Sequence, residues 1–209
     1  MVVDEKILIS LGAVEKIFQS GEKIFSKDSY CSYYYQIKKG TVKLFNIEEN
    51  GKELVHGFPF EGHCFGESYL FNDLPYAIEA EAVNEIVIYV LEKDVLISYL
   101  KENIYMLLKI NTYTAERIHF RYLISSFLII SNPARRIIIL FDHLKQYFGV
   151  EGQYSFKIPY TRNQISCLTG LRTETVIRTL KKLEVDKKLK ILDRKIFYTF
   201  LISCNLLFF

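Results

Sequence analysis

A glutamate and an arginine four residues apart could together read the edges of DNA base pairs. Glu174 and Arg178 have this spacing, which places two side chains on one face of a helix. A carboxylate can accept a hydrogen bond from the amino group of cytosine, and a guanidinium can donate two hydrogen bonds to O6 and N7 of guanine. The same spacing also suits an ordinary salt bridge on a solvated helix. The surrounding elements must decide between the two interpretations.

The positive charge of the chain is concentrated in its last third. Residues 1–130 contain 13 Lys and Arg against 18 Asp and Glu, whereas residues 131–209 contain 14 against 6 and carry a net charge of +8. Such an excess attracts polyanions, so nucleic acid is the natural partner of this segment. A basic surface with no partner would have the same composition.

The cysteines and histidines form no complete metal-binding or catalytic pattern. Four cysteines are scattered along the chain: Cys31, Cys64, Cys167 and Cys204. Without a CxxC pair they argue against a zinc finger or an iron–sulfur cluster and favour reduced thiols. His63 and Glu67 resemble part of a cupin metal site, but Phe65 stands where a cupin needs a second histidine. We therefore predict no metal, no cofactor and no catalytic residue, with a cupin-like metal enzyme as a distant alternative.

The first half of the chain has the pattern of an all-β sandwich or barrel. Short runs rich in β-branched and aromatic residues alternate with turns that contain glycine. The predicted strands cover residues 15–18, 33–37, 41–45, 53–58 and 85–90.

Helical periodicity replaces this pattern near Glu92 and continues to about Ser131 without a glycine or a proline. It predicts one short helix, a break around Glu102 and Asn103, and then a long helix. The long helix exceeds what a small domain needs for its own core. Its simplest partner is the same helix of a second copy in a symmetric dimer.

The basic segment has the elements of a winged helix-turn-helix. Asn132 and Pro133 predict the start of a helix that runs to residue 148. Thr161 is the expected cap of a helix over residues 162–168, and a turn at Gly170 separates it from a helix over residues 173–183. Residues 190–198 then form a hairpin wing.

This arrangement favours DNA contact for Glu174 and Arg178, because the second helix of the motif enters the major groove. Four further residues are expected to contact phosphates and to set the register without choosing the sequence: Thr161, Arg162, Thr175 and Lys181.

Two segments resemble the Crp/Fnr family of transcription regulators. Residues 65–77, which begin Phe-Gly-Glu and end Pro-Tyr-Ala, resemble the phosphate-binding cassette of cyclic-nucleotide domains. Residues 161–178 resemble the helix-turn-helix of the family, and with the strand spacing the resemblance covers nearly the whole chain. Thr173 stands where members that respond to cyclic AMP have an arginine, which implies a different DNA half-site.

The resemblance also implies an effector pocket with an altered preference. In the family, backbone amides such as that of Gly66 hold a cyclic phosphate, the glutamate at Glu67 receives a ribose hydroxyl, and an arginine neutralises the phosphate. Here Tyr76, followed by Ala77, replaces that arginine. A buried phosphate without a cation loses several kcal/mol of solvation, so an effector other than cyclic AMP is implied. Three residues of the long helix match pocket-lining positions: Arg117, Arg121 and Tyr122.

The sequence thus predicts an α+β chain with three parts. These are a double-stranded β-helix (jelly-roll) sensor barrel over 1–100, a dimerisation helix over 101–131 and a winged helix-turn-helix over 132–209. The resemblance implies a cytoplasmic, homodimeric regulator of transcription that binds a two-fold symmetric site on double-stranded DNA. It also implies an unidentified small-molecule effector and contact with RNA polymerase, without a membrane partner.

Two points stay open in the sequence. The main alternative is a DNA-binding regulator that is independent of any effector and keeps only a vestigial pocket. Residues 200–209 do not match the usual ending of the family, and we expect either a final strand or the product of a truncated reading frame.

Overall fold

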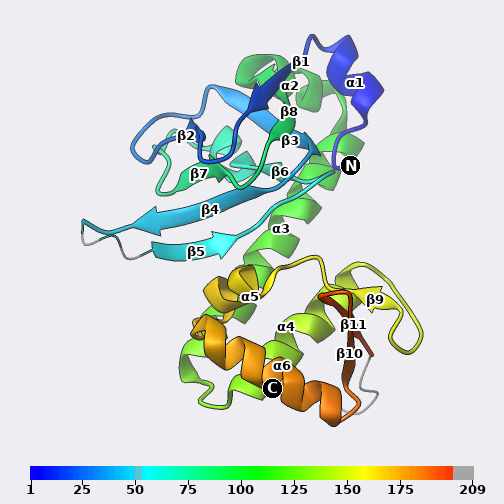
Figure 1. The fold of residues 1–209 in the computed structure, drawn as a ribbon. Helices are drawn as coiled ribbons and strands as arrows, with labels where there is room; N and C mark the ends of the chain where they lie inside the picture. Colours follow the sequence, from blue (N-terminus) through cyan, green and yellow to red (C-terminus); the bar gives the residue numbers. More distant parts are fainter. Residues whose placement is uncertain (50, 52, 200–209) are drawn as a thin grey trace. The chain divides into compact units, whose positions relative to one another are not determined.

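The computed structural model describes residues 1–49, 51 and 53–199, and it divides into two compact units (Figure 1). The first unit contains Met1–Arg121, and the second begins at Tyr122. Because this division falls inside the long helix, each unit is described by itself. The final strand predicted over residues 200–209 lies outside the described residues.

In the described part of the first unit, eight strands form two four-stranded sheets. In spatial order, one sheet contains β1 (Val14–Phe18), β8 (Ile86–Glu92), β3 (Tyr33–Lys39) and β6 (Cys64–Phe65). The other contains β2 (Lys23–Phe25), β7 (Glu79–Ala82), β4 (Val42–Ile47) and β5 (Glu53–Gly57). All pairs of neighbouring strands are antiparallel.

The five predicted strands are confirmed as β1, β3, β4, β5 and β8, but the predicted barrel does not close. The two sheets stay separate, so the fold is an open β-roll. Three strands were not predicted from the sequence, for a physical reason. β2 and β6 are only three and two residues long, and β7 alternates glutamate with alanine, two residues with low strand propensity.

Helices close the ends of the roll. Helix α1 (Glu5–Ser10) begins at Asp4, whose side chain accepts a hydrogen bond from the Lys6 amide. The fully buried amide of Gln36 binds the backbone of Val3 through both its oxygen and its nitrogen, at 2.9 and 2.8 Å. The N-terminal segment is thereby joined to the core of the roll. Two more helical elements are the 3-10 helix η1 (Glu67–Phe71), which follows β6, and α2 (Lys93–Glu102), which follows β8.

The predicted break and long helix are confirmed. The backbone departs from helical geometry at Asn103, and α3 (Ile104–Ser126) follows, ending in the 3-10 helix η2 (Phe127–Ile129). Met106, Ile110 and Tyr113 of α3 are buried in the core of the roll. The apolar residues of α3 therefore lie on two faces of the helix, and one of these faces packs inside the first unit.

The second unit is a winged helix-turn-helix, as predicted. Its elements are α4 (Pro133–Tyr147), β9 (Phe156–Lys157), α5 (Arg162–Thr169), α6 (Thr173–Val185), β10 (Leu189–Leu192) and β11 (Lys195–Tyr198). Asn132 caps α4 through hydrogen bonds from the amides of Ala134 and Arg135. The three strands form one antiparallel sheet in the order β10-β11-β9. Among the described residues, no helix is long and apolar enough to cross a membrane.

Candidate nucleic-acid interface and sensor site

The turn between α5 and α6 is fixed by local hydrogen bonds. Thr161 and Gln164 form a capping box. The Gln164 amide donates a hydrogen bond to the Thr161 hydroxyl at 3.2 Å, and the Thr161 amide donates one to the Gln164 side-chain oxygen at 2.8 Å. Gly170 ends α5 with φ of +65°, a conformation that suits glycine. The Thr173 hydroxyl lies 3.3 Å from that of Ser166, which binds the Leu171 carbonyl. These contacts hold the first turn of α6 against α5.

Helix α6 buries one face and presents another to solvent. Val176, Leu180 and Leu183 are buried in the core of the second unit. Glu174, Arg178 and Lys181 are exposed, while Thr173 and Thr175 are half-buried at the sides of the helix. Among the described residues, no ion pair joins Glu174 to Arg178. Both side chains therefore keep their hydrogen-bonding groups available on the exposed face.

Arg162 links the start of α5 to the wing. Its Nη1 donates a hydrogen bond to the Arg194 carbonyl at 2.9 Å. The wing turn consists of Asp193 and Arg194, which both have positive φ values of 48° and 62°, as a two-residue hairpin turn requires. The guanidinium of Arg162, which is predicted to contact a phosphate, therefore also forms the hydrogen bond that positions the wing.

Replacing Arg162 with alanine should loosen the wing. Loss of one hydrogen bond worth roughly 1 kcal/mol raises hydrogen–deuterium exchange at the wing-turn amides about fivefold. Arg162→Lys is the control, because it keeps the charge for a phosphate but lacks the planar donor group. Unchanged exchange in Arg162→Ala would contradict the positioning role.

The cassette places Glu67 among cationic and aromatic neighbours. Gly66 adopts a left-handed conformation that begins η1, and Glu67 follows it with only 7 % of its surface exposed. Burial raises the pKa of Glu67, and the positive charges of Arg117 and Arg121 oppose that shift. Arg117 approaches the backbone so closely that a Cβ on Gly57 would lie 2.9 Å from its Nη2. The structure thus brings Glu67, Arg117 and Arg121 together.

Two histidines, which the sequence did not place in the sensor site, join this group. The pKa of His63 is lowered to about 3 by burial and by the nearby charge of Arg117. The pKa of His56 is lowered to about 4 by burial and by Arg121. We refer to His56, His63, Glu67, Arg117 and Arg121 as the Glu67 cluster. No spacing in the sequence signals that the two histidines lie beside the arginines, because they come from different segments of the roll.

Tyr76 occupies the core instead of facing a ligand. Its ring is 1 % exposed and stacks on Phe25, with centroids 3.8 Å apart and planes inclined by 9°. The Tyr69 ring meets it edge-on at 4.8 Å, and a Cβ on Gly66 would lie 3.3 Å from it. The Tyr76 hydroxyl is buried and has no hydrogen-bond partner in the described part of the chain. A neutral aromatic ring thus stands where the resemblance implies an arginine.

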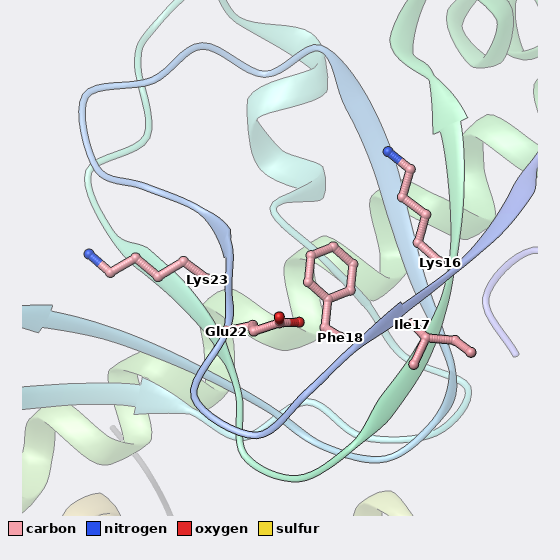
Figure 2. Close-up of a pocket in the computed structure, with 5 residues that line it drawn as sticks. All are labelled: Lys16, Ile17, Phe18, Glu22 and Lys23. Carbon is pink, nitrogen blue, oxygen red and sulfur yellow. The ribbon is translucent and has the colours of Figure 1, made fainter.

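The other two predicted pocket residues are on the surface. Ala77 is exposed, and its amide donates a hydrogen bond to the Tyr69 hydroxyl at 3.0 Å. Tyr122 is 72 % exposed. A hollow of about 540 Å³ between β1 and β2 is lined by other residues, among them Lys16, Phe18 and Lys23 (Figure 2). Figure 2 shows the two lysine side chains on either side of the Phe18 ring.

The cupin-like alternative finds no support in the site. Within residues 1–49, 51 and 53–199, no group of three or more His, Cys, Asp or Glu side chains could hold a metal ion. His63 instead packs on the Phe60 ring at 4.2 Å.

Comparison with known proteins agrees with this geometry. Residues 15–103 match the cyclic nucleotide-binding domain family. Electron transport regulator A of Shewanella oneidensis is 25 % identical over 179 residues, which are 81 % of this chain and 68 % of that protein. The structure of FixK2 from Bradyrhizobium japonicum is similar with a TM-score of 0.74 at 22 % identity, covering 89 % of this chain and 92 % of FixK2.

A transcriptional regulator of the CRP/FNR family from Thermus thermophilus is similar with a TM-score of 0.62 at 18 % identity, covering 90 % of this chain and 94 % of that one. These two structures share the whole fold, from the β-roll to the winged helix-turn-helix. Residues 15–103 of this chain thus match a cyclic nucleotide-binding domain, and the fold of the chain is similar to that of a CRP/FNR-family transcriptional regulator.

Proposed function

We propose that this regulator binds a two-fold symmetric site on double-stranded DNA as a homodimer, with α6 of each copy in the major groove. The observation that carries the proposal is the exposed face of α6, where Glu174 and Arg178 stand unpaired on a helix whose first turn is fixed. The net charge of +8 over residues 131–209 supports the same partner. Thr161, Arg162, Thr175 and Lys181 then contact phosphates, and Thr173 faces the base edges beside Glu174.

A repeating exposed face on α3 supports the homodimer. Its members follow one another at alternating intervals of four and three residues: Ile104, Leu108, Asn111, Ala115, Ile118 and Tyr122. All six are exposed, and Ile104, Leu108 and Ile118 are 65 %, 57 % and 47 % exposed. This interval is that of a two-stranded coiled coil, in which one polar residue such as Asn111 sets the register. A second α3 would cover the face.

The Glu67 cluster is our candidate effector site. It contains two guanidinium groups against one carboxylate, and its histidines are neutral near pH 7 because their pKa values lie near 3 and 4. The cluster therefore suits a neutral or anionic small molecule. The stack of Tyr76 on Phe25 favours a second candidate, a regulator that binds DNA without any effector.

Cyclic AMP is expected to bind this chain about 10- to 150-fold more weakly than it would bind the same pocket with an arginine in place of Tyr76. The phosphate would lack the charged donor that Tyr76 replaces, a loss of about 1.5 to 3 kcal/mol, and the stacked ring already fills the space. Isothermal calorimetry and the melting temperature with added cyclic nucleotide measure this directly. A micromolar dissociation constant for cyclic AMP would contradict our assignment of Tyr76.

Selection of bound sequences from a random DNA pool tests the main proposal. A palindromic motif whose half-sites lie one helical turn apart is expected, bound by two copies of the chain. Sedimentation of the free protein gives its oligomeric state in the same buffer. A monomer at micromolar concentration, or an enriched motif without two-fold symmetry, would overturn the homodimer. The proposal places the protein in the cytoplasm, gives it RNA polymerase as a further partner and includes no catalytic step.

A further inference from the structure

Two apolar side chains of α6, Ile177 and Val185, are exposed, and Ile177 is the one that lies in the first turns of the helix. Ile177 is 38 % exposed, although the core of the second unit is already supplied by Val176, Leu180 and Leu183. Its neighbours on the surface, one turn before and one turn after, are Glu174 and Lys181. A β-branched residue is unfavourable at an exposed helix position, because the helix restricts its side-chain rotamers and exposure to water gives no hydrophobic stabilisation.

Ile177 lies close in the sequence to Glu174 and Arg178, the two residues proposed to read bases. It follows Glu174 by three residues, so these two side chains lie on one face of the helix, and it directly precedes Arg178 in the sequence. The exposed Val185 at the end of α6 is similar in chemistry, but it lies eight residues further on, about 12 Å along the helix axis. The first turns of a recognition helix contact bases, which includes Ile177 and leaves out Val185.

The geometry points to Ile177 as a specificity-determining residue that contacts the C5 methyl group of a thymine in each half-site. The major-groove edge of thymine is the one base edge among the four that carries an apolar group, and an aliphatic side chain recognises it by van der Waals contact. This inference rests on the proposed DNA binding and adds to it one named base next to those read by Glu174 and Arg178.

The test removes only the methyl group. In a selected palindrome, each thymine of the half-site is replaced in turn by uracil, which pairs with adenine in the same way. Burial of one methyl-sized group corresponds to about a fourfold change in affinity. We expect one thymine per half-site whose replacement weakens binding about fourfold, and about sixteenfold when both half-sites are changed.

Three variants assign the effect to the side chain. Ile177→Ala should bind the thymine and uracil sites equally, whereas Ile177→Val should keep part of the difference. Val185→Ala is the matched control and should keep all of it. Melting temperatures of the three variants confirm that each protein is folded.

The results separate this inference from the proposed function. Specific binding without any uracil-sensitive thymine overturns the role of Ile177 and leaves the DNA-binding proposal standing. A uracil effect that persists in Ile177→Ala also overturns it, because another residue then contacts the methyl group. Absence of any sequence-specific binding overturns both.

Discussion

Arg178→Ala is expected to weaken DNA binding by about 1 to 3 kcal/mol per half-site and to relax the preference at one symmetric base pair. The reason is that the exposed guanidinium can donate two hydrogen bonds to O6 and N7 of a guanine, and alanine donates none. The other positions of the motif should remain readable. Binding measured across a set of single-base variants gives the profile of the wild type and of the variant.

Lys181→Ala is the matched control, since it removes a positive charge from the same face of α6. A residue that contacts only phosphate should weaken binding to all sequences alike and reduce the salt dependence by about one unit of slope per contact. Measurements at two salt concentrations separate the two effects. A sequence profile that stays the same in folded Arg178→Ala would mean that α6 meets DNA in another orientation.

We expect the protein to lose stability in mild acid because of the half-buried histidines of the Glu67 cluster. The pKa of His63 is about 3 in the folded protein and near 6.5 in the unfolded chain. As the pH falls below 6.5, the unfolded state takes up the proton first, so stability decreases until the folded pKa is reached. The single group should lower the free energy of unfolding by about 2 kcal/mol between pH 7 and pH 5. His56 adds a change of the same sign.

Denaturant unfolding of His63→Phe at both pH values measures this contribution. Phenylalanine keeps the ring that packs on Phe60 but does not titrate, so the decrease between pH 7 and pH 5 should be about 2 kcal/mol smaller. The raised pKa of Glu67 acts in the opposite direction, and the comparison of variants cancels it. An equal decrease in wild type and His63→Phe would exclude His63 as the source.

Prediction from the sequence succeeded where local interactions decide the structure. Long strands rich in β-branched residues and the helix caps at Asn132 and Thr161 were found, because their signals lie within a few residues of one another. Strands β2, β6 and β7 were missed, since they are held by pairing with distant segments and not by their own composition.

The same distinction applies to the candidate sites. The residues of α6 that are predicted to contact DNA follow from the periodicity of one helix; Glu174, Arg178 and Lys181 are exposed, and Thr173 and Thr175 are half-buried. The Glu67 cluster is assembled from several segments far apart in the chain. For that reason the sequence did not show that His56 and His63 lie beside Arg117 and Arg121, or that Tyr76 turns into the core.

The stack of Tyr76 on Phe25 makes an arginine at position 76 costly for the stability of the roll. A single Tyr76→Arg change would place a guanidinium against an aromatic core at a position that is 1 % exposed, without an anion unless a ligand is already bound. Making space for a phosphate would also require a smaller residue at Phe25. A variant with an arginine at this position should therefore be less stable than the present chain until it binds an anion. Selection for stability alone would retain tyrosine at position 76.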